Sequence, residues 1–230
     1  MIQLSLFDTA LSLVPILLGI AIYYWHRYNT ADLWLSSGRM VLQLITIGYL
    51  LTFLFDYELS WLGLLVMSFM LVVASIITIR PLEKKGMRLW ATAFIALLIA
   101  GGFNIAWMLF VVLKLSPWYQ PSIVISLAGM VFANGMNTLS VAAERYEQEC
   151  KNNNANARKI AFDAAMIPQI NTLLAVGLVS LPGMMTGQIL SGVEPLLAVR
   201  YQVMIMSMVI STSIISLAIY LWIQNRKPSP

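Results

Sequence analysis

The sequence predicts an all-α integral membrane protein, with about seven transmembrane helices in one transmembrane domain spanning residues 1–230. Of its 230 residues, 60% are hydrophobic and only 10% are charged, whereas a soluble domain carries roughly 25% charged residues. The mean hydropathy is +0.80. A soluble fold could not hide this much apolar surface, so we expect a lipid bilayer to be the natural solvent of the chain.

Seven apolar runs are long enough to cross a hydrocarbon core of about 30 Å, which needs about 20 residues and tolerates about 17. Lipid offers no partner to backbone amides, and the runs lack the alternation of barrel strands, so we expect helices. The second and sixth runs are the shortest. The runs are Leu4–Trp25, Met40–Phe55, Trp61–Ile79, Leu89–Leu113, Ile123–Ala143, Ala164–Leu181 and Gln202–Ile223.

The basic residues predict the orientation. Of the 14 lysines and arginines, all but Lys114 and Arg200 follow the first, third or fifth run or lie in the C-terminal tail. Cytoplasmic loops carry the excess of basic residues, so we expect the N-terminus outside and the C-terminus in the cytoplasm. The acidic Asp56 and Glu58 then lie outside. The first run lacks a basic n-region and a cleavage site, so it is expected to be a retained span.

Several classes of function find no support in the residues. The net charge of +4 is distributed as a membrane protein requires, which argues against nucleic acid as a partner. The chain has one cysteine and one histidine. An intramolecular disulfide therefore cannot form, and we do not expect an all-protein zinc site. Because the chain has no Walker loop and no set of catalytic residues, we expect no enzymatic activity and no cofactor bound by this chain.

Asparagines inside the runs are candidates for a translocation path. Asn134 and Asn137 are three residues apart in the fifth run and project from roughly one helix face, and Asn171 lies in the sixth run. Amides in hydrocarbon are costly without partners. Hydrogen bonding between packed helices is the alternative explanation, and Gly129 with Ala133 forms a small-xxx-small pair that would allow such packing.

The stretch SLPGMMTGQILSG, residues 180–192, predicts an interruption at the outer membrane surface. We expect Pro168 to start or kink the sixth helix and Pro182-Gly183 to end it. A re-entrant or interfacial segment then follows, because irregular backbone at membrane depth needs protein or a water-filled cavity beside it. The path candidates here are Gly183, Met184, Met185, Gly187 and Gln188. Met184 and Met185 could meet a soft metal, although methionine more often fills packing gaps.

The block LPGMMTGQILSGVEPLLAVRYQ, with AMIPQINTLLAVGLVSL before it, resembles the signature of the Fet-type iron-export ABC permease family, which is similar to the plant aluminium-sensitivity permeases. Ser36–Phe55 and Leu127–Val141 resemble the second and fifth spans of that family. The resemblance implies an inner-membrane permease that dimerises, works with a separate cytoplasmic ATPase subunit carrying ATP-Mg, and exports iron or a related metal. It also implies a contribution to metal and oxidative-stress tolerance.

The segment between the fifth and sixth runs is shorter than is usual in that family. Either a trimmed coupling helix remains around Arg145–Asp163, or the chain couples to its ATPase in another way. The candidates for the ATPase contact are Arg145, Glu149, Arg158, Lys159 and Asp163. Two other functions remain open: a non-transporting membrane scaffold, and an ion-coupled carrier. The ion-coupled carrier has less support, because a proton-coupled carrier would keep an ionisable residue at mid-membrane and the apolar runs have none there.

Overall fold

The computed structural model describes residues 5–57 and 60–225, without the side chains of residues 6, 53–57 and 225. The predicted boundary Leu4 and the charged residues Glu58, Arg226 and Lys227 lie outside the described residues. The chain divides into two compact units, Met1–Tyr57 and Glu58–Pro230. The expectation of a single permease domain stays a prediction.

The first unit contains α1 (Leu6–Leu11), α2 (Val14–Trp25) and α3 (Ala31–Tyr57). Ser5 and Asp8 form a capping box in which the Asp8 amide donates to Ser5 Oγ at 3.1 Å. The helix is interrupted between α1 and α2, just before Pro15, whose ring removes a backbone donor. The first predicted run is therefore a broken helix, and the second run lies within α3.

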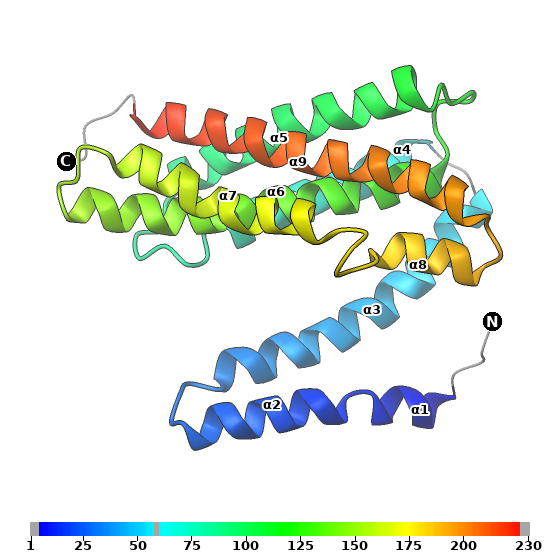
Figure 1. Ribbon diagram of the computed structural model, residues 1–230, viewed down its shortest axis with the longest axis horizontal. Helices are drawn as coiled ribbons and strands as arrows, with labels where there is room; N and C mark the ends of the chain where they lie inside the picture. Colours follow the sequence, from blue (N-terminus) through cyan, green and yellow to red (C-terminus); the bar gives the residue numbers. More distant parts are fainter. Residues whose placement is uncertain (1–4, 58–59, 226–230) are drawn as a thin grey trace. The chain divides into compact units, whose positions relative to one another are not determined.

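The second unit is a helical bundle in which α6 packs against four other helices, α4, α5, α7 and α9 (Figure 1). Its elements in chain order are α4 (Ser60–Thr78), α5 (Met87–Trp107), the π-helix η1 (Met108–Val112), α6 (Pro121–Lys151), α7 (Ala157–Ala175), α8 (Gly183–Leu190) and α9 (Pro195–Asn225).

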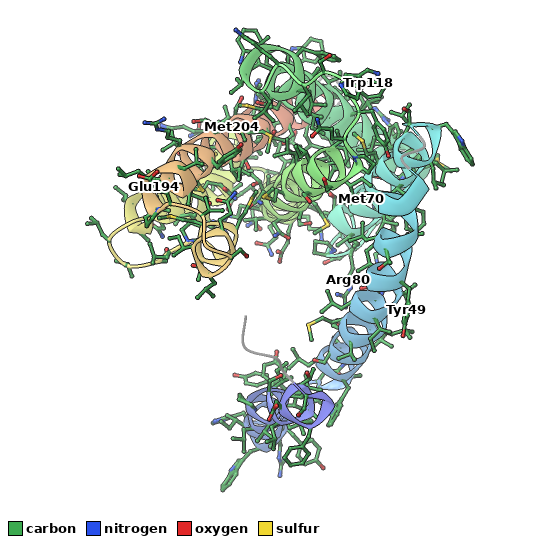
Figure 2. All side chains as sticks on the ribbon, turned by 90° about the vertical axis from the view of Figure 1, so that its right-hand side faces the viewer. Tyr49, Met70, Arg80, Trp118, Glu194 and Met204 are labelled. Atoms are coloured by element: carbon green, nitrogen blue, oxygen red, sulfur yellow. The ribbon has the colours of Figure 1, made fainter. Side chains whose placement is uncertain are left out.

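Small residues allow α6 to approach its neighbours closely. A Cβ on Gly135 of α6 would lie 2.8 Å from Leu97 Cδ2 of α5, so no larger residue fits there without a shift. Helix interfaces in lipid are enriched in such residues. The predicted pair is only partly used: a Cβ on Gly129 would lie 3.3 Å from Met70 Cε of α4, beside α6 (Figure 2). Ala133 is exposed, so the close contact uses Gly135 instead.

Five helices within the described residues are long and apolar enough to cross a membrane, and they correspond to the first, third, fourth, fifth and seventh predicted runs. They are Phe7–Trp25, Ser60–Thr78, Met87–Val112, Pro121–Lys151 and Pro195–Gln224. The chain is therefore a multi-pass membrane protein. The second and sixth runs correspond to α3 and α7, which are outside this set. The count of seven spans stays a prediction.

The boundaries of the sixth run were predicted wrongly. The helix α7 runs from Ala157 to Ala175 with Pro168 inside it, so it ends before Leu181. A tight turn follows, in which the Gly177 amide donates to the Ser180 carbonyl at 2.9 Å. Pro182 is the N-cap of α8, so it starts a helix where we expected it to end one. The first residues of a helix need no intrahelical donor, which makes proline acceptable there.

The segment after this turn is helical where we expected irregular backbone. The eight residues of α8 span about 12 Å, too short to cross a bilayer. A re-entrant or interfacial position for α8 stays a prediction. The next helix, α9, begins at Pro195, so Arg200 and Tyr201, which we placed before the seventh run, lie inside it.

Replacing Gly177 by alanine tests the turn. Its φ of +83° lies in the left-handed region, where a Cβ costs about 1–2 kcal/mol. We expect Gly177→Ala to lower the free energy of unfolding by about 1 kcal/mol, measured by thermal unfolding of the detergent-purified chain. Gly187→Ala is the matched control, since a Cβ there meets nothing within 4 Å and alanine favours the helix. Equal effects of the two substitutions would contradict the assigned turn.

Candidate functional site

A pocket of about 380 Å³ lies between the end of α7, the turn after it, α8 and α9. Apolar side chains form most of its walls. The lining residues are Leu173, Val176, Gly177, Pro182, Met185, Val199, Gln202, Val203, Met206, Ser207 and Ile210. Pockets of about 300–1,000 Å³ with apolar walls and few polar groups are typical of small-molecule sites.

The polar group of interest in this pocket is Gln202 of α9. Its side chain is 7% exposed, and its Oε1 has no hydrogen-bond partner among the described residues. Burying an amide without a compensating hydrogen bond costs roughly 1–3 kcal/mol in proteins. This oxygen is itself closed off from solvent, so it lies behind the pocket wall and does not open into the pocket.

Of the candidates predicted on α8, the structure places one in the pocket. Met185 lines the pocket, and Met206 of α9 lines it as well. Met184 is 38% exposed and does not line the pocket. Gln188 is half-buried, and its Oε1 has no hydrogen-bond partner in the part of the chain that the structure describes. A Cβ on Gly183 or Gly187 would meet nothing within 4 Å, so packing requires neither glycine.

A second polar feature joins three helices at Thr138 of α6, which is 2% exposed. Gln169 Nε2 of α7 donates to Thr138 Oγ1 at 2.9 Å, and Ser213 Oγ of α9 lies 3.1 Å from the same oxygen. The Thr138 hydroxyl also lies 2.9 Å from the Asn134 carbonyl of its own helix. A hydroxyl has one proton, so Thr138 donates to one of these oxygens while accepting from Gln169.

The asparagine candidates are not brought together with the pocket. Asn134 is half-buried, and its Nδ2 donates to the Met130 carbonyl at 2.8 Å. Asn137 is exposed, and so is Asn171 on α7. For Asn137 the described residues show no hydrogen bond, so the packing explanation has no support within this chain.

Asn137 belongs to a polar stripe on α6. The exposed polar residues Ser122, Ser126, Asn137, Glu144 and Gln148 are separated by 4, 11, 7 and 4 positions, which places all of them on one side of a helix with 3.6 residues per turn. Such a stripe on a membrane helix indicates contact with water or with another polypeptide.

The α6–α7 hairpin is held by charged residues where α6 ends. Arg145 NH2 lies 2.8 Å from Glu149 Oε1, and Asn154 Nδ2 donates to the other Glu149 oxygen at 2.7 Å. Lys151 Nζ lies 2.7 Å from Glu83 Oε2, in the segment between α4 and α5. The Lys151 ammonium lowers the pKa of Glu83 below its ordinary value. The Lys151–Glu83 pair joins the end of α6 to the segment between α4 and α5, whereas the bonds of Glu149 lie within α6 and the turn after it.

This hairpin settles the form of the predicted coupling region. Residues 145–163 comprise the end of α6, a turn and the start of α7, with no separate helix. The trimmed coupling helix that we considered around Arg145–Asp163 is thus divided between the ends of α6 and α7. Glu149 binds Asn154 of the turn and pairs with Arg145 within α6. Arg145, Arg158, Lys159 and Asp163 are all exposed. The expected ATPase contact of all five residues stays a prediction.

Sequence reasoning missed Gln169, Thr138 and Ser213, and it missed Gln202, Met206 and Ser207 in the pocket. Two signals were available: Gln169 follows Pro168 directly, and ISTSIIS in the seventh run places polar side chains three or four residues apart. A cluster of three or more His, Cys, Asp or Glu side chains suited to a metal ion is absent from the described part of the chain.

The Thr138 network makes a prediction about stability. Thr138→Val keeps the shape but removes the acceptor of Gln169, so we expect it to lower the free energy of unfolding by about 1 kcal/mol. A double-mutant cycle with Gln169→Leu, followed by thermal unfolding, should give a coupling of about 0.6–1.7 kcal/mol. Ser126→Ala is the control, because that exposed hydroxyl bonds only to its own helix at Ser122. Additive effects of the two substitutions would show that no such bond exists.

Comparison with known proteins finds relatives that align with most of this chain. Its sequence is 33% identical over 216 residues to the UPF0014 membrane protein slr1647 of Synechocystis, covering 86% of this chain and 83% of that protein. It is 30% identical to the probable iron export permease protein FetB of Escherichia coli, covering 96% of this chain and 91% of FetB. It is 29% identical to ALUMINUM SENSITIVE 3 of Arabidopsis thaliana, covering 90% and 81%.

No solved structure matches the chain. The model of the uncharacterised protein family UPF0014 matches residues 6–160 and 154–228, nearly the full length. The resemblance to the iron-export and plant aluminium-sensitivity permeases, stated mainly from residues 165–202, is therefore confirmed by these relatives. The chain is a member of the UPF0014 family of membrane proteins.

Proposed function

We propose that this chain is the transmembrane subunit of an ATP-driven ABC exporter that moves iron or a related metal out of the cytoplasm. The similarity to the probable iron export permease FetB over 96% of the chain carries this proposal. The similarity to ALUMINUM SENSITIVE 3 agrees with metal tolerance as the broader role. ATP hydrolysis, with its ATP-Mg, belongs to a separate cytoplasmic subunit, and this chain is not itself an enzyme.

The proposed topology has seven spans, with α3 and α7 as the second and sixth, the N-terminus outside and the C-terminus in the cytoplasm of the inner (cell) membrane. The contact between Lys151 and Glu83 supports it, because it brings the two most basic segments to one end of the bundle. Basic residues are retained on the cytoplasmic side of a membrane, so they are expected to gather at one end of the bundle.

The α6–α7 hairpin is the proposed docking element for the ATPase. Glu149 and Lys151 make the contacts of its turn. A displacement of the hairpin by the ATPase would therefore move α6 and α7, and with them the Thr138 network that joins the two helices. The exposed Arg158, Lys159 and Asp163 remain available to the partner. Two copies of the permease would complete the assembly, with the polar stripe around Asn137 facing the path between them.

Impermeant maleimide labelling in intact cells tests the orientation. In a Cys150→Ser background, which removes the single native thiol, we expect Lys114→Cys to react from outside and Lys84→Cys to react only after the membrane is opened. Both lysines are exposed. Labelling of Lys84→Cys from outside would reverse the topology and exclude docking of a cytoplasmic ATPase on the hairpin.

Reconstitution in liposomes with a candidate ATPase tests the function. We expect metal-stimulated ATP hydrolysis and metal movement that both require the two subunits. The double variant Arg158→Glu and Lys159→Glu should weaken association on the order of tenfold, since reversed charges repel the partner, while acidic residues in the first turn of α7 suit the helix dipole.

Arg200→Glu is the matched control, an exposed charge near the start of α9 on the side that we propose to face outward. It should leave association unchanged. Transport by this chain alone, driven by an ion gradient, would establish the carrier instead. A stable complex without nucleotide-dependent transport would indicate a scaffold.

A further inference from the structure

The segment between α4 and α5, residues 79–86, reaches the same end of the bundle as the turn of the α6–α7 hairpin (Figure 1). Where α4 ends, Ser140 Oγ of α6 donates to the Thr78 carbonyl at 3.2 Å. Further along, Glu83 pairs with Lys151, the last residue of α6. The helix rises about 16 Å between Ser140 and Lys151, so the segment follows α6 to its end.

Three contacts hold this segment against α6 and the core. Lys151 Nζ lies 2.7 Å from Glu83 Oε2, and the Glu83 amide donates to Glu147 Oε2 at 3.2 Å. The preceding residue, Leu82, is buried and belongs to the apolar core. Because a buried side chain and a backbone hydrogen bond occur at consecutive positions, the two lysines that follow them leave the bundle from a defined place.

The carboxylates nearest this end are engaged within the chain. Glu83 and Glu147 oxygens lie 2.7 and 3.9 Å from Lys151 Nζ, and Glu149 pairs with Arg145. Five further cations are exposed, and none of them has a salt bridge among the described residues. We call them the basic surface: Lys84, Lys85, Arg88, Arg158 and Lys159.

The other acidic side chains of the hairpin lie further from its turn. Glu144 is about 10 Å before the end of α6, and Asp163 is about 9 Å after the start of α7. The part of the chain that reaches furthest along α6 therefore presents positive charge. Complementary potentials bring two surfaces together and orient them, so the ligand of the basic surface carries negative charge.

The depth of the segment favours a soluble protein over lipid headgroups. The apolar span of α4 ends at Thr78, level with Ser140. The contacts of Glu83 with Glu147 and Lys151 lie about 10–16 Å beyond that level. The headgroup layer is about 5–8 Å thick on each side of the hydrocarbon core. The basic surface thus extends past the headgroups into the cytoplasm of the proposed topology.

We propose that the α4–α5 segment and the α6–α7 hairpin form one docking surface, and that its basic side chains bind an acidic face of the cytoplasmic ATPase. This inference rests on the proposed function, and it adds a second contact and the chemistry of the partner. Since the segment connects α4 to α5, an ATPase bound to both elements would act on four helices of the bundle at once.

Binding of the ATPase to the full chain in nonionic detergent tests the surface. The probe is the candidate ATPase of the liposome reconstitution. We expect Lys84→Glu with Lys85→Glu to weaken binding about tenfold at about 0.1 M salt, and much less at about 0.5 M, because salt screens exposed charges. The matched control is Lys114→Glu with Arg200→Glu, the same charge change at two exposed positions that we propose to face outward. It should leave binding unchanged.

Photo-crosslinking locates the contact. Benzoylphenylalanine in place of Lys85 should join the chain to the ATPase on irradiation, and mass spectrometry of peptides should place the link on a surface rich in aspartate and glutamate. The same group in place of Lys114 should give no link.

The outcomes separate this inference from the proposed function. If Arg158→Glu with Lys159→Glu weakens binding and the Lys84 and Lys85 variant does not, the hairpin docks alone, and the inference fails while the proposed function stands. An ATPase that does not bind the unaltered chain would overturn both. An effect of the Lys84 and Lys85 variant that requires nanodiscs of anionic lipid would assign the surface to headgroups and overturn the inference as well.

Discussion

The bundle of the second unit depends on close contact between helices in a solvent that offers no hydrophobic reason for them to associate. Lipid tails are as apolar as leucine, so contact must come from dispersion and from hydrogen bonds between helices. Gly135 leaves room for Leu97 of α5, and the methyl of Thr212 and the hydroxyl of Ser216 lie within 4 Å of where its Cβ would stand. A larger residue at position 135 would therefore separate α6 from both α5 and α9.

Close contact between the helices also explains which polar side chains are buried in the bundle. Thr212, Ser213 and Ser216 of α9 are fully buried. The Thr212 and Ser216 hydroxyls donate to the carbonyls of Met208 and Ser213, and Ser213 Oγ is an acceptor for Thr138. Hydroxyls are small enough for tight packing and can satisfy themselves within a helix. Asn137 and Gln202 differ, because one is exposed on a membrane helix and the other is buried without a partner for its oxygen. The exposed Asn137 amide is the one of the two that can bond to a group outside the chain.

The two ends of α7 have different roles. At its start, the hairpin with α6 is joined to the segment between α4 and α5 by the Lys151–Glu83 ion pair. At its end, the turn at Gly177 leads into α8 and forms one wall of the pocket. Pro168 lies between these ends, next to Gln169, which bonds to Thr138. A proline leaves one carbonyl of the preceding turn without its helical partner. This weakens α7 beside the side-chain hydrogen bond that joins it to α6 within the described residues.

Composition, hydrophobic runs and the placement of lysine and arginine were sufficient to predict a helical multi-pass membrane protein, because a bilayer imposes length and polarity on every span separately. The block around Gly183–Gln188 was sufficient to indicate the family. The helix boundaries near Ala175, Pro182 and Pro195 were beyond these signals, since proline can start a helix as well as end one. The pocket and the Thr138 network join residues far apart in the chain, and only the packing of α6, α7, α8 and α9 brings Gln169 to Thr138, or Met185 to the face of α9 that carries Gln202.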